Sequence, residues 1–162
     1  HCTELPDLEA ARDYGEKLVY PESGTGNSGH FYIERSGRIE QWVPIDRIAH
    51  HVRGHNGTSI GIELDNRGRF PDWFDSRRQK MTQAYSDTQL DALIELLGQL
   101  QADYPSLRWI AGHEDLDPSM VPSSDRPAVM VSRKMDPGPL FPWHKILAST
   151  RLRRFVPDNS SL

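Results

Sequence analysis

Apolar residues recur at helical spacing in the second half of the chain and in shorter runs elsewhere. The helical positions are Leu90, Leu93, Ile94, Leu97 and Leu100. They form one apolar face, so the spacing predicts an amphipathic helix over residues 87–103. Ser86 and Gln89 have the S-x-x-Q spacing of a capping box at the start of this helix. The pattern LEAARDYGEKL predicts another helix over residues 8–18, with Asp7 as its N-cap.

Short runs rich in β-branched and aromatic residues predict strands. The expected strands cover residues 30–34, 38–43, 58–64 and 107–111. The first two flank Ser36-Gly37, which is typical of a hairpin turn. The third, TSIGIEL, is short and apolar, as in a central strand. A last helix is expected near residues 143–150. Because strands alternate with helices, the sequence predicts an α/β domain built on one mixed β-sheet.

The segments between these elements are polar or rich in Gly, Pro and Ser. Residues 20–29 are expected to form a loop, and residues 66–85 a surface excursion. The basic stretch at residues 151–154 is expected at a solvated helix end. No internal repeat, low-complexity segment or linker divides the sequence, so residues 1–162 are expected to form one domain.

Composition excludes some classes of protein. The 162-residue chain is 36% hydrophobic and 26% charged, as is ordinary for a globular domain. Its net charge of -4 argues against a nucleic-acid binder, which would carry a basic surface. No apolar run reaches the ~20 residues that a transmembrane helix needs. Cys2 is the single cysteine, so it has no intramolecular disulfide partner. Oligomeric state is not indicated.

Three separated stretches carry candidate metal ligands. HCTE, GHEDLDP and RKMDPGP supply His1, His113 and Asp136, two imidazoles and one carboxylate. That donor set suits a catalytic zinc ion whose fourth position stays open for water. Cys2 is next to a candidate ligand, but adjacent residues on a strand point to opposite faces.

Two further residues suggest water-driven cleavage of an amide or ester. Glu63 stands at the end of the predicted central strand, where burial without a partner would cost several kcal/mol. It is therefore either one half of a structural ion pair or a general base that later acts as general acid. Lys134 could place an ammonium group near the oxyanion that forms when water attacks.

Simpler interpretations exist for each ligand. The pair His113-Glu114 also suits an exposed surface, and Asp136 followed by Pro137-Gly138 is common turn chemistry. The three ligands lie far apart in the sequence, so no local motif links them.

The stretches taken in order resemble a known family, the type-2 N-acetylmuramoyl-L-alanine amidases, which are related to phage lysozyme-amidases and to peptidoglycan recognition proteins. The resemblance runs from His1 to about Trp143. It is carried by HCTE, SGHFYIERSGRIEQWVP, AHHVRG, TSIGIELDNRG, GHEDLDP and RKMDPGPLFPW. It implies the peptidoglycan recognition protein-like amidase fold, in which a central mixed sheet is flanked by helices.

The resemblance also implies an activity, a cofactor and a site. The expected reaction is zinc-dependent hydrolysis of the amide bond between the lactyl group of N-acetylmuramic acid and L-alanine, in peptidoglycan or muropeptide fragments. The matched residues are His1, His113 and Asp136 as Zn2+ ligands, Glu63 and Lys134 as catalytic residues, and His30, His51, Asn66 and Arg67 near the substrate. For His30 and His51 a packing role stays open beside substrate contact. Asn66 and Arg67 are expected at the rim, where they could meet the peptide or sugar.

The sequence departs from the family pattern at three places. The first ligand usually follows a hydrophobic strand, so the printed sequence is expected to omit upstream residues, including any leader. Residues 119–131 are longer than the usual link between the second and third ligands and are expected to form a flap beside the cleft. Some relatives have a catalytic tyrosine where this chain has Gly29, so the acidic role is expected to fall on Glu63.

Three alternatives stay open. A non-catalytic peptidoglycan-binding module would share the fold, an N-terminal His1 could chelate copper, and a zinc ion could be purely structural. A structural site usually closes with four protein ligands, and it leaves Glu63 and Lys134 without a role. The sequence does not show whether the substrate is intact cell wall or 1,6-anhydro-muropeptides. For localisation, the periplasm or cell envelope is expected, and the bacterial cytoplasm stays open as the alternative.

Overall fold

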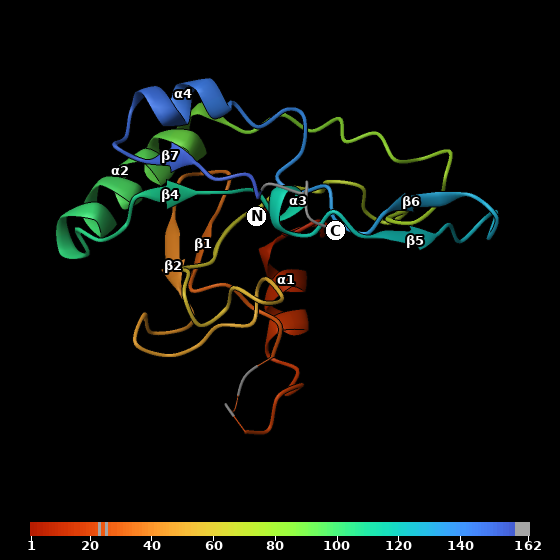
Figure 1. Ribbon diagram of the computed structural model, residues 1–162, viewed down its shortest axis with the longest axis horizontal. Helices are drawn as coiled ribbons and strands as arrows, with labels where there is room; N and C mark the ends of the chain where they lie inside the picture. Colours follow the sequence, from red (N-terminus) through yellow and green to blue (C-terminus); the bar gives the residue numbers. More distant parts are fainter. Residues whose placement is uncertain (23, 25, 158–162) are drawn as a thin grey trace.

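The computed structural model describes residues 1–22, 24 and 26–157, and its helices surround a small central sheet (Figure 1). The helices are α1 (Leu8–Gly15), α2 (Asp87–Asp103), α3 (His113–Leu116) and α4 (Trp143–Ala148). The strands are β1 (Phe31–Ile33), β2 (Ile39–Gln41), β3 (Ile62–Leu64), β4 (Trp109–Ile110), β5 (Met120–Pro122), β6 (Met130–Ser132) and β7 (Arg153–Arg154). The predicted α/β architecture with a central mixed sheet is confirmed.

The central sheet has the order β2-β1-β3. β1 pairs antiparallel with β2 through a hairpin and parallel with β3, where Tyr32 lies opposite Glu63. Cys2 forms a parallel bridge with Leu64, so the first residues of the chain run beside β3. This pairing places His1 next to β3, the strand that carries Glu63.

The two faces of β1 pack against different helices. Phe31 and Ile33 belong to the main core together with the leucines of α2, whereas Tyr32 packs with Leu8 and Ala11 of α1. Figure 1 accordingly shows α1 and α2 on opposite sides of the central strands. Because successive side chains of a strand alternate between faces, the α1 side also receives Glu63, the register partner of Tyr32.

The amphipathic helix was predicted with its observed bounds, but its capping box is only half present. The Ser86 hydroxyl accepts a hydrogen bond from the Gln89 amide, as expected. The Gln89 side chain does not reach back to Ser86. It is fully buried and donates to the carbonyl oxygens of Ile33 and Asp65, just where β1 and β3 end. The Ile33 carbonyl also accepts from the Asp65 amide at 2.9 Å, so Gln89 adds a second donor there.

Three expectations about the rest of the chain were wrong. Residues 151–154 do not form a helix end, because Arg153 and Arg154 pair as β7 with β4. Residues 66–85 are not a plain surface excursion, since Asn66, Arg69, Met81 and Tyr85 are buried there. The helix expected over residues 8–18 ends at Gly15.

Residues 120–132, which include most of the stretch expected as a flap, form an antiparallel hairpin. β5 pairs with β6, with Val121 opposite Val131. Figure 1 shows this hairpin reaching away from α2 and α4. Within the described residues, no helix is long and apolar enough to span a membrane.

Candidate metal centre

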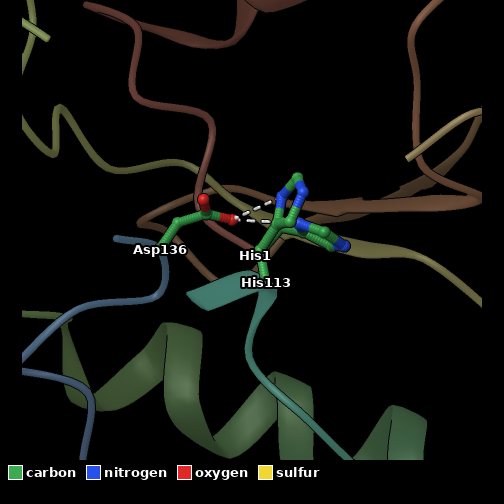
Figure 2. A group of neighbouring side chains, drawn as sticks. All are labelled: His1, His113 and Asp136. Carbon is green, nitrogen blue, oxygen red and sulfur yellow. Dashed lines mark hydrogen bonds and ion pairs between the residues drawn. The ribbon is translucent and has the colours of Figure 1, made fainter. Parts of the chain in front are cut away.

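His1, His113 and Asp136 point toward one another from three separate segments (Figure 2). One ligand atom from each lies within 4.8 Å of the other two. The Oδ2 atom of Asp136 is 2.9 Å from His1 Nδ1 and 3.4 Å from His113 Nδ1. Two imidazoles and one carboxylate thus converge on one point, as the sequence predicted.

His1 is held by the edge of β3. Its backbone nitrogen donates to the carbonyl of Ile62 at 3.0 Å, and its carbonyl accepts from the amide of Leu64 at 3.2 Å. The ring is fixed as well, because His1 Nε2 lies 3.1 Å from His51 Nδ1 and Nδ1 faces Asp136.

His113 and Asp136 are joined through their backbones. α3 begins at His113, and the amide of Glu114 donates to the carbonyl of Asp136 at 3.0 Å. Gly112 packs directly on Pro137, the residue after Asp136: a Cβ atom on Gly112 would lie 2.7 Å from Pro137 Cδ. A glycine is therefore needed for the two ligand segments to approach this closely.

The donor set fits a divalent cation. His113 Nε2 and Asp136 Oδ1 are buried and have no hydrogen-bond partner in the described structure, although unpaired buried polar atoms are costly. Burial opposes the charge on Asp136, but the hydrogen bond and charge of His113 prevail and hold the pKa of the Asp136 carboxyl below its usual range. A carboxylate that stays ionised is the form a metal ligand needs.

Glu63 lies beside this cluster. Its Oε1 atom is 3.9 Å from His1 Nδ1, and its side chain is only 15% exposed. Burial raises the pKa of the Glu63 carboxyl, which the negative charge of Asp136 reinforces. A carboxyl group with a raised pKa is suited to exchanging a proton during a reaction near neutral pH.

The cluster opens into a cavity of about 830 Å³. The predicted residues among its lining are His1, His51, Glu63, His113, Lys134 and Asp136. Lys134 is half-buried, and within the described part of the chain its ammonium forms no hydrogen bond or ion pair. Its positive charge opposes the increase in the pKa of Glu63.

The two other histidines expected near the cleft differ in their position relative to the cavity. His51 lines the cavity and contacts His1. His30 does not line it and is 2% exposed. Its Nδ1 atom accepts from the amide of Gly61 at 3.0 Å and its Nε2 donates to the carbonyl of Arg47 at 3.1 Å. The packing interpretation therefore holds for His30.

The rim expectation for Asn66 is wrong. Asn66 is 1% exposed, its amide nitrogen donates to the carbonyl of Gln83, and its oxygen accepts from the amide of Gly68. Arg67 is exposed but lies outside the cavity lining, with its guanidinium 5.8 Å from the centroid of the Phe70 ring. β3 ends at Leu64, and neither Asn66 nor Arg67 beyond it lines the cavity.

Tyr32 and Arg69 are among the lining residues that sequence reasoning missed. The Tyr32 hydroxyl accepts from the amide of Gly29 at 3.1 Å, and a Cβ atom on Gly29 would lie 3.0 Å from Glu63 Cγ. The alternation along β1 was the available signal for Tyr32, because its register partner is Glu63. No local signal marked Arg69, which belongs to a segment with no regular structure.

Comparison with known proteins identifies the family. A family model described as N-acetylmuramoyl-L-alanine amidase matches residues 1–139. The chain belongs to this amidase family. The resemblance found from the sequence motifs is thereby confirmed.

The chain is similar to several named amidases. It is 36% identical to N-acetylmuramoyl-L-alanine amidase AmiD of Escherichia coli over 118 residues, which are 67% of this chain and 37% of that relative. It is 31% identical to 1,6-anhydro-N-acetylmuramyl-L-alanine amidase AmpD of Haemophilus influenzae over 134 residues, which are 76% of this chain and 59% of the relative. The chain therefore spans about two fifths to three fifths of the length of these relatives.

Two solved structures share the fold over most of the chain. One is AmiD from E. coli in complex with anhydro-N-acetylmuramic acid-L-Ala-D-gamma-Glu-L-Lys, with a TM-score of 0.65 and 28% identity. The other is AmpDh3 from Pseudomonas aeruginosa in complex with anhydromuramic pentapeptide, with a TM-score of 0.65 and 26% identity. Each match covers 92% of this chain, and it covers 55% and 57% of the respective neighbour.

Proposed function

We propose that this amidase-family chain is a zinc-dependent hydrolase that cleaves the amide bond between the lactyl group of N-acetylmuramic acid and the L-alanine of a peptidoglycan stem peptide. One observation carries the proposal: the cluster of His1, His113 and Asp136 shares its cavity with Glu63 and Lys134. Family membership supports the same activity.

His1, His113 and Asp136 would hold the zinc ion. Bound zinc supplies a Lewis acid that lowers the pKa of a coordinated water and polarises a carbonyl group. The protein keeps these three side chains ready for it through the edge of β3, the start of α3 and the Gly112–Pro137 contact. Three ligands leave a coordination position free, as hydrolysis requires.

Glu63 would move the proton. Its carboxylate takes a proton from the attacking water and then delivers it to the leaving nitrogen of L-alanine. Burial beside Asp136 raises the pKa of Glu63 and so makes both halves of this transfer accessible. The absence of a side chain at Gly29 leaves room for Glu63 in this position.

Lys134 would stabilise the negative charge that develops on the carbonyl oxygen. Its ammonium lines the same cavity and has no other hydrogen-bond or ion-pair partner among the described residues. A positive group that is already in place when the charge develops contributes directly to lowering the barrier.

The expected substrate class is a peptidoglycan fragment that contains muramic acid and its peptide. The cavity of about 830 Å³ lies within the usual range for small-ligand sites. The two structural neighbours hold anhydromuramyl peptides. Anhydro-muropeptides, and a role in fragment recycling, are therefore the first to test, with wall remodelling tested on intact peptidoglycan.

The test is mass spectrometry of the products after zinc-loaded protein is incubated with anhydro-muropeptides and with purified peptidoglycan. Free stem peptides beginning at L-alanine are expected from wild type and not from Glu63→Gln. Intact substrate, in a protein with confirmed zinc and tight muropeptide binding, would instead identify a non-catalytic binding module. Copper in place of zinc would overturn the assignment of the metal.

A further inference from the structure

Arg69 forms a buried connection in the wall of the cavity. Its side chain is 1% exposed, and its fork of N–H groups is fully used. The guanidinium donates to both carboxylate oxygens of Glu4, at 2.8 and 2.9 Å. Its other acceptors are the carbonyls of Trp73, Ser132 and Arg133 and the side-chain oxygen of Gln79. One side chain thus joins three segments that are remote in sequence.

The first end of this connection lies close to His1. Glu4 has a left-handed backbone conformation, with φ of 49°, and its carboxylate also accepts from the backbone amide of Arg69 at 3.2 Å. A Cβ atom on Gly68 would lie 2.6 Å from Glu4 Cγ, so the turn before Arg69 must be a glycine for Glu4 to fit. Between His1 and Glu4, Thr3 is fixed to the carbonyl of Leu64.

The second end lies immediately before Lys134. Arg69 donates to the carbonyl of Ser132 at 2.8 Å and to that of Arg133 at 3.2 Å. The ammonium of Lys134 has no hydrogen bond or ion pair of its own among the described residues. The place of this ammonium in the cavity therefore depends on the backbone from which its flexible side chain extends.

We infer that Arg69 is a positioning residue for Lys134: by binding Glu4 on one side and the Ser132 and Arg133 carbonyls on the other, it sets the distance between the His1 segment and the lysine. This inference rests on the proposed function of the same site. Lysine cannot replace Arg69 in this role, because a single ammonium does not reproduce the planar fork that serves both ends at once.

The first test is a double-mutant cycle on turnover. Arg69→Lys is expected to lower kcat on the order of 10- to 100-fold, with KM and zinc content unchanged, because small misplacements of a catalytic group have effects of that size. In a Lys134→Ala background the same change is expected to alter kcat by less than about 2-fold. An equal loss with and without Lys134 would overturn the inference.

A matched control and a second, weaker variant separate positioning from stability. Arg77→Lys changes an exposed arginine that pairs with the carboxylates of Asp75 and Asp125, and it should leave kcat and the unfolding midpoint unchanged. Glu4→Gln keeps the guanidinium and its bonds to the Ser132 and Arg133 carbonyls. Because it weakens the Glu4 end of the connection, it should lower kcat by a smaller factor than Arg69→Lys does, and by less than about 2-fold in the Lys134→Ala background.

The second test does not depend on activity. The lysines of the chain are Lys17, Lys80, Lys134 and Lys145. In carbon-labelled protein, Arg69→Lys should shift the side-chain NMR signals of Lys134 and leave those of Lys17 and Lys145 in place; Lys80 follows Gln79, an acceptor of Arg69, and is not used as a control. An unchanged Lys134 signal refutes the inference even in a protein that turns out to be inactive. If the wild-type protein shows no turnover, that result by itself refutes only the proposed function.

If Arg69→Lys does not fold, the neutral pair Glu4→Gln with Arg69→Gln provides the same cycle without a lone buried charge. The expected outcomes are the same: loss of kcat only where Lys134 is present, and a shifted Lys134 signal. A folded pair with wild-type kcat would overturn the inference.

Discussion

Replacing Gly112 with alanine should separate two metal ligands without changing either of them. The new Cβ atom would lie 2.7 Å from Pro137 Cδ, whereas ordinary contact begins at 3.4 Å. The segments that carry His113 and Asp136 must therefore move apart by about 0.7 Å, the difference between these two distances. The backbone itself tolerates alanine, because φ at Gly112 is -80°. The whole effect thus comes from the contact with the proline ring.

That displacement is large for a metal site. Ligand distances in such sites are held to about 0.2 Å, and disturbing the groups that orient the ligands costs about 10- to 100-fold in metal affinity. Overpacking of this kind also destabilises a fold by about 1–3 kcal/mol. Gly112→Ala should therefore bind zinc about 10- to 100-fold more weakly and unfold at a lower temperature.

The assay is a zinc competition titration against a chromophoric chelator, combined with thermal unfolding of metal-free and zinc-loaded protein. Gly98→Ala in α2 is the matched control, because a Cβ atom there meets nothing within 4 Å. It should leave zinc affinity unchanged and stabilise the helix by up to about 1 kcal/mol. Zinc affinity of Gly112→Ala within 2-fold of the control's (about 0.4 kcal/mol) would refute the argument that this contact sets the ligand geometry.

Four further predictions concern the site itself. Glu63→Gln should lower turnover by about 10²- to 10⁴-fold with zinc content unchanged, and a wild-type rate would exclude Glu63 as the proton carrier. Asp136→Ala should lose zinc at neutral pH, as measured by metal analysis after dialysis, and retention at unchanged affinity would refute its role as a ligand. Chelator treatment of wild type should abolish hydrolysis, and added zinc should restore it. Gly29→Val should collide with Glu63 Cγ, which is 3.0 Å from a Cβ atom at that position, and should slow turnover with zinc affinity intact; equal turnover would show that Glu63 does not depend on this space.

How far the fold could be predicted depended on whether an element is defined locally. Helix α2 has an apolar face and an N-cap within its own sequence, and its bounds were predicted correctly. The pairing of β4 with β7 joins residues 109–110 to residues 153–154, and a two-residue strand has no periodicity to detect. The basic residues there suggested a solvated helix end because only their composition was visible.

The same distinction applies to the site. His1, His113 and Asp136 could be proposed because few residue types bind zinc and the surrounding motifs resemble a family. Asn66 was misassigned because closeness to Glu63 in sequence was taken for closeness in space. In the structure its amide is bound to Gln83 and Gly68. Arg69 was missed because its role follows from carbonyl groups, which carry no sequence signal.

The residues that bear the chemistry and the residues that place them therefore belong to different classes. The first class contains the imidazoles, carboxylates and ammonium of the cavity, whose identity follows from what zinc and an amide require. The second class contains Gly112, whose lack of a side chain lets the two ligand segments come close, and Arg69, which connects the Glu4 segment to the backbone before Lys134. Replacing a residue of the first class should abolish a particular step, such as zinc binding or proton transfer. Replacing a residue of the second class should only lower zinc affinity or kcat, because the reacting groups are still present but displaced. Comparing Gly112→Ala in metal affinity with Arg69→Lys in kcat separates the two positioning roles, because one acts between two ligands and the other on the lysine beside them.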